Sequence, residues 1–239
     1  MTVRRFGAGP EIVWIHGLGE SSTSFDPVVA RLPQFEHTLV DLPGYGRSPW
    51  PAAPSDLEAT ADHLAAWLRE RPPAVVIGHS MGGVLATMIA ERGAASKIID
   101  IDGNLTHGDC TFSLEAAAFD ADAFAAHGFA EMRARIYAAG QTELPLRGYH
   151  AAMCFASPYV FHHQAADLVK LSTTDTLAPR LAALRVPALF VAGVPGGICA
   201  ASRARLTELG VQWVGVEPAG HWVYLDQLDH FVELVATFA

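Results

Sequence analysis

A serine between two glycines, directly after an apolar run, is the feature of this sequence best suited to chemistry. Ser80 stands in the segment 78–82, Gly-His-Ser-Met-Gly, which follows the β-branched run 75–77. A serine hydroxyl is a weak nucleophile, but a sharp strand-to-helix turn lifts it clear of a sheet and aims helical N–H groups at the carbonyl oxygen under attack. Gly78 and Gly82 favour such a turn, because a Cβ at either position would collide with the strained backbone. The segment therefore predicts that Ser80 is a catalytic nucleophile.

The second chemical feature is the glycine-rich segment 16–19, His-Gly-Leu-Gly, which follows a short apolar run. Such a loop can turn a backbone N–H toward the serine, and we predict that the Leu18 N–H is one donor to the oxyanion. The second predicted donor is the N–H of Met81, because it lies at a helix N-terminus where the macrodipole favours developing negative charge. Each donor of this kind contributes about 2.7–4 kcal/mol of transition-state stabilisation. His16 lies inside the turn, so we interpret it as a loop-shaping residue; the alternative is a general base.

A histidine near the end of the chain completes the set of groups needed for acyl transfer. His221 follows the predicted strand 211–216 through the segment Pro-Ala-Gly-His and precedes an amphipathic helix. It therefore lies at the carboxyl end of a strand, the side of an open parallel sheet on which active sites assemble. We predict that His221 is the general base. A structural role is the alternative for one histidine among eleven.

Strand and helix signals alternate along the chain and place these groups at the ends of strands. Predicted strands lie at 12–15, 36–41, 75–77, within 97–104, 187–193 and 211–216. Ser55 and Glu58 have the spacing of a capping box, which predicts a helix that ends at Pro72.

These segments resemble those of the α/β-hydrolases. The matching segments, in chain order, are 16–19, 41–48, 78–83 and 218–221. The resemblance implies an α/β fold with a doubly wound, mostly parallel sheet, and a triad in the order serine, acid, histidine. It also implies that Asp41 is a structural turn residue and not a member of the triad.

The acid of the implied triad departs from its commoner place in the family. In most relatives it follows the strand equivalent to 187–193, but here residues 194–199 contain no carboxylate. A minority carry it after the strand that follows the nucleophile helix, where Asp102 stands 22 residues past the serine. We predict that Asp102 orients the general base and stabilises the imidazolium. Three alternatives remain open: Asp100, Asp226, or an Asp102 that only binds loop amides.

An insertion separates the two halves of the predicted core. Between Asp102 and Pro187 lie 84 residues, whereas a strand–helix–strand unit takes about 30. In the family this position holds a helical cap, so the resemblance implies a core of residues 1–104 and 177–239 and a cap of residues 105–176. The cap would roof the serine. Its aromatic side chains, between Phe112 and Phe161, are expected to line an apolar pocket or to form the cap's own core.

Composition limits the class of protein. The 239 residues are 51% hydrophobic without an uninterrupted apolar run of membrane-spanning length. The first residues lack an apolar signal core, and three cysteines without metal-ligand spacing fit reduced thiols, so we expect a soluble cytoplasmic protein. A net charge of −9 argues against nucleic acid or an anionic membrane as partner. The histidine spacing fits no zinc site, and we expect neither metal nor cofactor.

We therefore expect a serine hydrolase that cleaves carboxylic esters, lactones included, of small to medium apolar substrates through an acyl-enzyme. Its expected partner is a small-molecule ester or lactone. Close variants of this site cleave C–C bonds of vinylogous diketones or thioesters, and the triad does not separate them. The alternative from another class is a non-catalytic small-ligand receptor on the same fold. The sequence does not specify the oligomeric state.

Overall fold

The computed structural model describes all 239 residues and centres on one sheet of seven strands in the order β1-β3-β2-β4-β5-β6-β7. The strands, in chain order, are β1 (Thr2–Gly7), β2 (Glu11–Ile15), β3 (Glu36–Asp41), β4 (Val75–His79), β5 (Lys97–Ile101), β6 (Ala188–Gly196) and β7 (Trp213–Gly220). β1 runs antiparallel to β3, and every other neighbouring pair is parallel. The predicted α/β fold with a mostly parallel sheet is confirmed.

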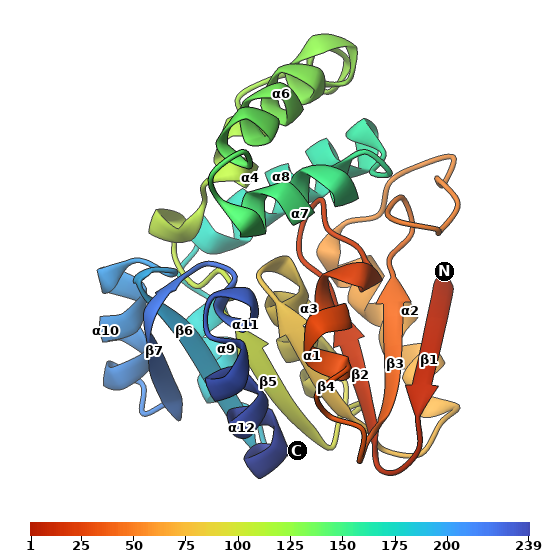
Figure 1. Cartoon of the computed structure of the whole chain (residues 1–239). Helices are drawn as coiled ribbons and strands as arrows, with labels where there is room; N and C mark the ends of the chain where they lie inside the picture. The colour runs from red at the N-terminus through yellow and green to blue at the C-terminus, as the bar shows by residue number, and fades with distance from the viewer.

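Helices cover both faces of the sheet (Figure 1). They are η1 (Ser22–Phe25), α1 (Asp26–Val29), α2 (Leu57–Arg69), α3 (Met81–Glu91), α9 (Leu177–Ala182), α10 (Ala200–Glu208), α11 (Val223–Asp226) and α12 (Leu228–Phe238). α3 packs between α2 and α9, whereas α1 packs against α12 on the opposite face. The sheet is therefore doubly wound, and the carboxyl ends of its parallel strands meet at one edge.

The helices between β5 and β6 lie over that carboxyl edge (Figure 1). They are η2 (His107–Asp109), α4 (Phe112–Ala117), α5 (Ala121–Ala123), the π-helical turn η3 (Phe124–Gly128), α6 (Phe129–Ala139), α7 (Leu144–Met153) and α8 (Pro158–Thr173). Phe124, Phe129 and Phe161 pack against one another with ring centroids 5.4 to 5.7 Å apart. Part of the aromatic content of this segment therefore forms its own core.

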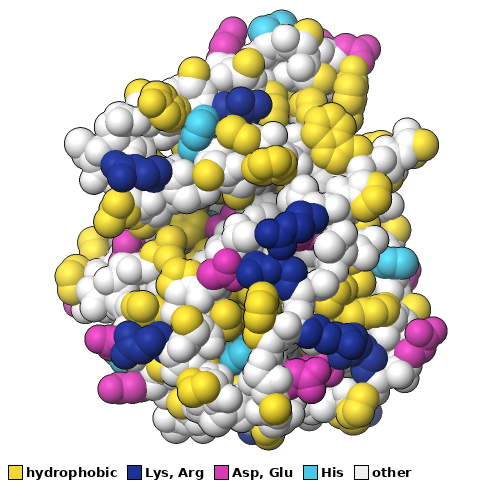
Figure 2. Space-filling model, turned by 45° about the vertical axis from the view of Figure 1, so that its right-hand side comes forward, with side chains coloured by type: hydrophobic (Ala, Val, Ile, Leu, Met, Phe, Trp, Pro, Cys, Tyr) yellow, Lys and Arg dark blue, Asp and Glu magenta, His cyan; other side chains and the backbone are white.

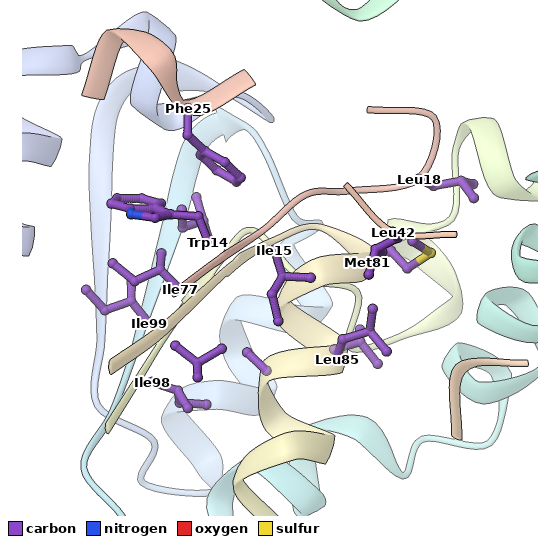
Figure 3. Packing of buried hydrophobic residues seen from close by; sticks show 14 of the residues in the cluster. Trp14, Ile15, Leu18, Phe25, Leu42, Ile77, Met81, Leu85, Ile98 and Ile99 are labelled. Carbon is purple, nitrogen blue, oxygen red and sulfur yellow. The ribbon is translucent and has the colours of Figure 1, made fainter. Parts of the chain in front are cut away.

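The centre of the sheet is apolar on both faces, which is why the central strands are continuous apolar runs. Trp14, Ile77 and Ile99 are register partners on β2, β4 and β5. Figure 3 shows them on the side of the sheet that carries Phe25, whereas Ile15 faces α3 on the other side. This packing and the strand register hold the carboxyl ends of β2, β4 and β5 next to one another, and the site is built from these ends.

Two local details differ from the sequence-based expectations. Asp56, and not Ser55, is the N-cap of α2. It directly precedes the helix, and its carboxylate accepts the Ala59 N–H at a distance of 2.7 Å. The predicted capping box is therefore wrong. β7 continues to Gly220 because Ala219 and Gly220 still pair with β6, so His221 directly follows a strand.

No helix combines the length and the hydropathy that crossing a bilayer requires. On the face shown in Figure 2, acidic and basic side chains are interspersed over the lower part of the molecule.

Candidate active site

Ser80 occupies a strained turn between β4 and α3. Its backbone has φ 55° and ψ −122°, and its N–H donates to the Ile101 carbonyl at 2.8 Å. A Cβ at Gly78 would lie 1.9 Å from the Gly82 carbonyl oxygen, and one at Gly82 would lie 2.1 Å from the Ile15 carbonyl oxygen. Only glycine therefore fits on both sides of the turn, which presents Ser80 to a cavity at the carboxyl edge of the sheet.

Asp102 and His221 form a hydrogen-bonded pair beside that cavity. His221 Nδ1 lies 2.6 Å from Asp102 Oδ2. The other carboxylate oxygen of Asp102 accepts the N–H groups of Gly193 at 3.1 Å and Ile198 at 3.0 Å. Asp102 is fully buried, so these donors hold its carboxylate in one orientation. Because a carboxylate only accepts, Nδ1 carries the proton, and the lone pair of the His221 ring is on Nε2.

The two other candidate carboxylates have different partners. Asp100 accepts the Gly103 N–H at 2.9 Å, and Asp226 accepts the Gly220 N–H at 2.8 Å. Burial raises the pKa of Asp100 well above its usual range, and the charge of Asp102 raises it further against the bond from Gly103. Burial therefore favours the protonated form of Asp100 over its charged form.

The predicted oxyanion donors flank the serine. Leu18 and Ser80 line the same cavity, and a Cβ at Gly17 would lie 3.1 Å from Ser80 Cβ. The Leu18 N–H has no acceptor within the protein. Met81 is the first residue of α3, so its N–H has no intrahelical acceptor either. The N–H groups of Leu18 and Met81 are thus both without an acceptor in the protein.

His16 and Asp41 support the loops without entering the cavity. Nδ1 of His16 donates to the Gly17 carbonyl at 2.8 Å, and Nε2 accepts the Leu42 N–H at 3.0 Å. Burial lowers the pKa of His16, so its ring is neutral and both nitrogens are engaged. Asp41 accepts the N–H groups of Ser22 and Arg47 at 2.7 and 3.0 Å. Both residues shape loops, as expected.

Glu20 and His79 form a buried pair next to the site that was not predicted from the sequence. His79 Nδ1 lies 2.9 Å from Glu20 Oε2, and its Nε2 lies 2.9 Å from the His221 carbonyl oxygen. Glu20 Oε2 also accepts the Gly17 N–H at 2.7 Å. Its Oε1 accepts the Trp222 indole N–H at 2.7 Å and the Tyr224 hydroxyl at 3.2 Å. In the sequence, His79 lies within the segment 78–82 and Glu20 directly follows the segment 16–19, but neither position indicates that the two side chains are paired.

The pair is ionised at neutral pH. Burial by itself raises the pKa of Glu20, but the charge of His79 and the hydrogen bonds from His79, Gly17 and Trp222 lower it to about 2. Burial likewise lowers the pKa of His79, but Glu20, the His221 carbonyl and the charge of Asp102 raise it above its usual value. The pair is therefore an imidazolium and a carboxylate, each almost fully buried.

This pair predicts a pH-dependent stability. Glu20→Gln is expected to lower the free energy of unfolding by about 3–5 kcal/mol, because it leaves His79 buried without its counter-ion. Because the pKa of Glu20 is lowered, this residue stabilises the folded protein above pH 4.5, and the stabilisation is lost as the pH falls toward 2. Because the pKa of His79 is raised, this residue stabilises the folded protein below pH 6.5, and the stabilisation is lost at higher pH. The difference between wild type and variant should therefore be largest between pH 4.5 and 6.5. Urea unfolding across pH measures it, and a difference independent of pH would contradict the assignment.

Three hollows meet at His221. A cavity of about 30 Å³ beside Ser80 is roofed by Phe112, Tyr149 and Leu168, and only five of its fourteen lining residues are hydrophobic. A groove of about 1000 Å³ runs outward between the start of α7 and the β7–α11 loop, and a hollow of about 220 Å³ lies on the Asp102 side. The cavity is more polar than the apolar pocket expected from the sequence. No lysine or arginine lines any of the three.

No group of three or more histidine, cysteine, aspartate or glutamate side chains converges in a way that could hold a metal ion. The ionisable groups around Ser80 are instead engaged with one another and with backbone amides.

Comparison with known proteins gives a consistent picture. A sequence model of the Alpha/beta hydrolase family matches residues 12–236. Lipase LipV of Mycobacterium tuberculosis is 40% identical over 92 residues, which cover 37% of this chain and 35% of the lipase. A 2-(acetamidomethylene)succinate hydrolase of Mesorhizobium japonicum is 27% identical over 182 residues, or 75% of this chain and 59% of that protein. The matched part thus spans less than two thirds of either relative.

The fold also matches solved structures. The crystal structure of the enol-lactonase from Burkholderia xenovorans is similar with a TM-score of 0.82 at 20% identity, covering 99% of this chain and 95% of that one. At this identity the likeness shows the shared fold.

Proposed function

Because this chain belongs to the alpha/beta hydrolase family, we propose that it hydrolyses carboxylic esters, lactones included, through an acyl-enzyme on Ser80. The observation that carries the proposal is the buried, fixed Asp102 carboxylate, 2.6 Å from His221 Nδ1, beside a serine held in a strained turn. The names of the relatives, a lipase and a hydrolase, agree with this class of reaction.

The proposed reaction follows from the atoms around the cavity. Ser80 Oγ attacks the ester carbonyl while His221 Nε2 takes its proton, and Asp102 stabilises the imidazolium. The carbonyl oxygen becomes an oxyanion that accepts the N–H groups of Leu18 and Met81. His221 then protonates the leaving alcohol, and a water activated by the same nitrogen releases the acid. We expect the Ser80 hydroxyl to hydrogen-bond His221 Nε2 when substrate is bound, since catalytic hydrogen bonds often form fully only in the complex.

We propose that residues 105–176 are the cap of this site. Phe112 of α4, Tyr149 of α7 and Leu168 of α8 close the cavity above Ser80. A cavity of about 30 Å³ favours a short acyl group, and the much larger groove favours the alcohol part of the ester. Phosphonylation separates a hydrolase from a receptor. A fluorophosphonate should react with Ser80, forming a P–O bond and releasing fluoride, whereas an unlabelled protein would favour the non-catalytic alternative.

The charges of the cavity and of the groove favour substrates without a carboxylate. Asp109 lines the cavity, Glu143 and Asp226 line the groove, and neither hollow is lined by a lysine or an arginine. The charge of Glu20 is balanced by His79. An anionic group would enter a region of negative potential and find no cation to pair with. The Mesorhizobium relative is named for a substrate with two carboxylates. We therefore propose a substrate class different from the one in that name, namely uncharged esters.

We expect kcat/KM for p-nitrophenyl butyrate to exceed that for p-nitrophenyl hemisuccinate by about tenfold or more, because the two esters have similar length and differ by one carboxylate. The ratio should shrink with added salt, which screens exposed charge. Glu143→Lys should lower the ratio, and Glu70→Lys, at the opposite edge of the sheet, should leave it unchanged. Equal or faster hydrolysis of the anionic ester would contradict the proposed charge preference and leave the esterase assignment intact.

A further inference from the structure

We propose that Glu20 and His79 are positioning residues that hold the oxyanion loop, the nucleophile turn and the general-base loop in register. The inference rests on the proposed hydrolase activity and adds to it a device outside the triad. The observations that carry it are the hydrogen bonds of two side chains that are both almost fully buried.

The hydrogen-bond partners, together with the lowered pKa of Glu20, determine the charge of the pair. His79 Nε2 faces the His221 carbonyl oxygen, which can only accept, so Nε2 carries a proton. Glu20 receives the Gly17 N–H, the Trp222 indole N–H and the Tyr224 hydroxyl, so its oxygens act as acceptors. Because the pKa of Glu20 is lowered to about 2, its carboxyl group has no proton to donate at neutral pH, so Nδ1 of His79 donates to Glu20 as well. A ring that donates from both nitrogens is an imidazolium.

Apart from the bond from the Tyr224 hydroxyl, each bond from the pair to another residue involves a proposed reacting residue or the residue next to one. Gly17 precedes Leu18, whose N–H is a proposed oxyanion donor, and its N–H is bound by Glu20. His79 precedes Ser80 and binds the main chain of His221, while Glu20 binds the next residue, Trp222. Three loops that are far apart in the sequence are thus joined through one charged pair.

The surroundings of His79 determine how it responds to pH. Its ring lies 4.6 Å from the His221 ring and 5.1 Å from the Tyr224 ring, centroid to centroid. The charged or titratable groups that act on it are Glu20, Asp102 and, at a distance, His16 and the buried Asp100. Loss of the His79 proton at high pH leaves one donor for two acceptors, so either the Glu20 bond or the His221 bond breaks.

Glu20→Gln is the direct test. The amide removes the negative charge and places an NH₂ group against at least one of the groups that donate to Glu20. The loop that carries His221 then loses one of the hydrogen bonds that hold it in place. We expect kcat on p-nitrophenyl butyrate to fall by about 10- to 100-fold, as for a displacement on the order of 1 Å, with a much smaller change in KM. We also expect the alkaline fall of kcat to move to lower pH, because His79 loses the charge that keeps its proton. A purely structural role would lower the yield of folded protein without moving this pH limb.

Two further variants act as controls. Glu58→Gln removes a carboxylate that pairs with Arg92 and Arg180 far from the site, and it should leave kcat and the pH profile unchanged. Glu20→Asp keeps the charge but shortens the reach, so it should lower kcat while the alkaline limb stays in place. It also serves as the test if Glu20→Gln does not fold. Melting curves establish folding for each variant.

The outcomes are decisive for the positioning role. Folded Glu20 variants with wild-type kcat and an unmoved pH profile would overturn it. A wild-type enzyme that fails to hydrolyse any ester and is not labelled by a fluorophosphonate would instead overturn the proposed function, so the two failures are distinguishable.

Discussion

Ser80→Ala is expected to lower kcat for p-nitrophenyl butyrate by ~10³-fold or more, because the covalent step is lost while the oxyanion donors and the binding cavity remain. The serine side chain takes no part in holding the turn, since only its N–H and carbonyl are hydrogen-bonded. Folding should therefore survive, and the melting temperature should stay close to that of the wild type. Steady-state kinetics and fluorophosphonate labelling of the two proteins measure the effect.

A second serine of the same cavity provides the matched control. Ser113 is buried in α4 and lines the cavity beside Ser80. Ser113→Ala should change kcat by less than about tenfold, as expected for a group that contacts substrate without reacting. If Ser80→Ala kept near-wild-type activity, or if Ser113→Ala lost as much, the proposed nucleophile would be wrong.

The fold was predictable from the sequence because the strands that build the site are buried on both faces. Runs such as 12–15 and 75–77 are apolar at successive positions, and in a doubly covered parallel sheet no other pattern would satisfy both faces. The turn at Ser80 was also predictable from the sequence, because it leaves no space for a Cβ at position 78 or 82 and both residues are glycine.

The buried ion pair could not be predicted, because its partners come from loops that meet only in the folded protein. Glu20 and His79 are 59 residues apart, and Trp222 is 202 residues from Glu20. Nothing in the local sequence marks a glutamate as buried. The predicted cap of α2 was wrong for a different reason. The adjacent residues Ser55 and Asp56 are both good N-caps, so an error of one position in the start of the helix selects the wrong residue.

The assignment of Asp102 as the acid next to His221 rests on both the sequence and the structure. Because residues 194–199 contain no carboxylate, the sequence pointed to Asp102 as the acid that orients His221. In the structure, residues 194–199 lie next to the Asp102 carboxylate. Gly193, directly before this segment, and Ile198 within it donate their N–H groups to Asp102. A Cβ at Gly197 would lie 2.2 Å from Asp102 Oδ1. The loop is thus shaped around a carboxylate that comes from β5.

Asp102→Asn is expected to lower kcat by about 10²–10³-fold, less than the ~10⁴ known for the equivalent change in a serine protease, because an activated ester is an easier substrate. The backbone N–H groups of Gly193 and Ile198 select the amide oxygen for the Oδ1 position, so the NH₂ group faces His221. Nδ1 must then accept, and the proton moves to Nε2, where it faces Ser80 and prevents general-base catalysis. Binding should change little, so the loss should appear in kcat.

The neighbouring aspartates separate this mechanism from a general loss of negative charge. Asp100 accepts the Gly103 N–H and does not contact His221, and in Asp100→Asn the amide keeps both the shape and an oxygen for that bond. Asp226 binds only the Gly220 N–H on the exposed side. Each of these asparagine variants should retain kcat within about tenfold of the wild type, since neither changes the His221 tautomer. If Asp102→Asn kept most of the activity while Asp100→Asn or Asp226→Asn abolished it, the orienting acid would have to be reassigned, because tautomer control belongs to whichever carboxylate accepts the Nδ1 proton.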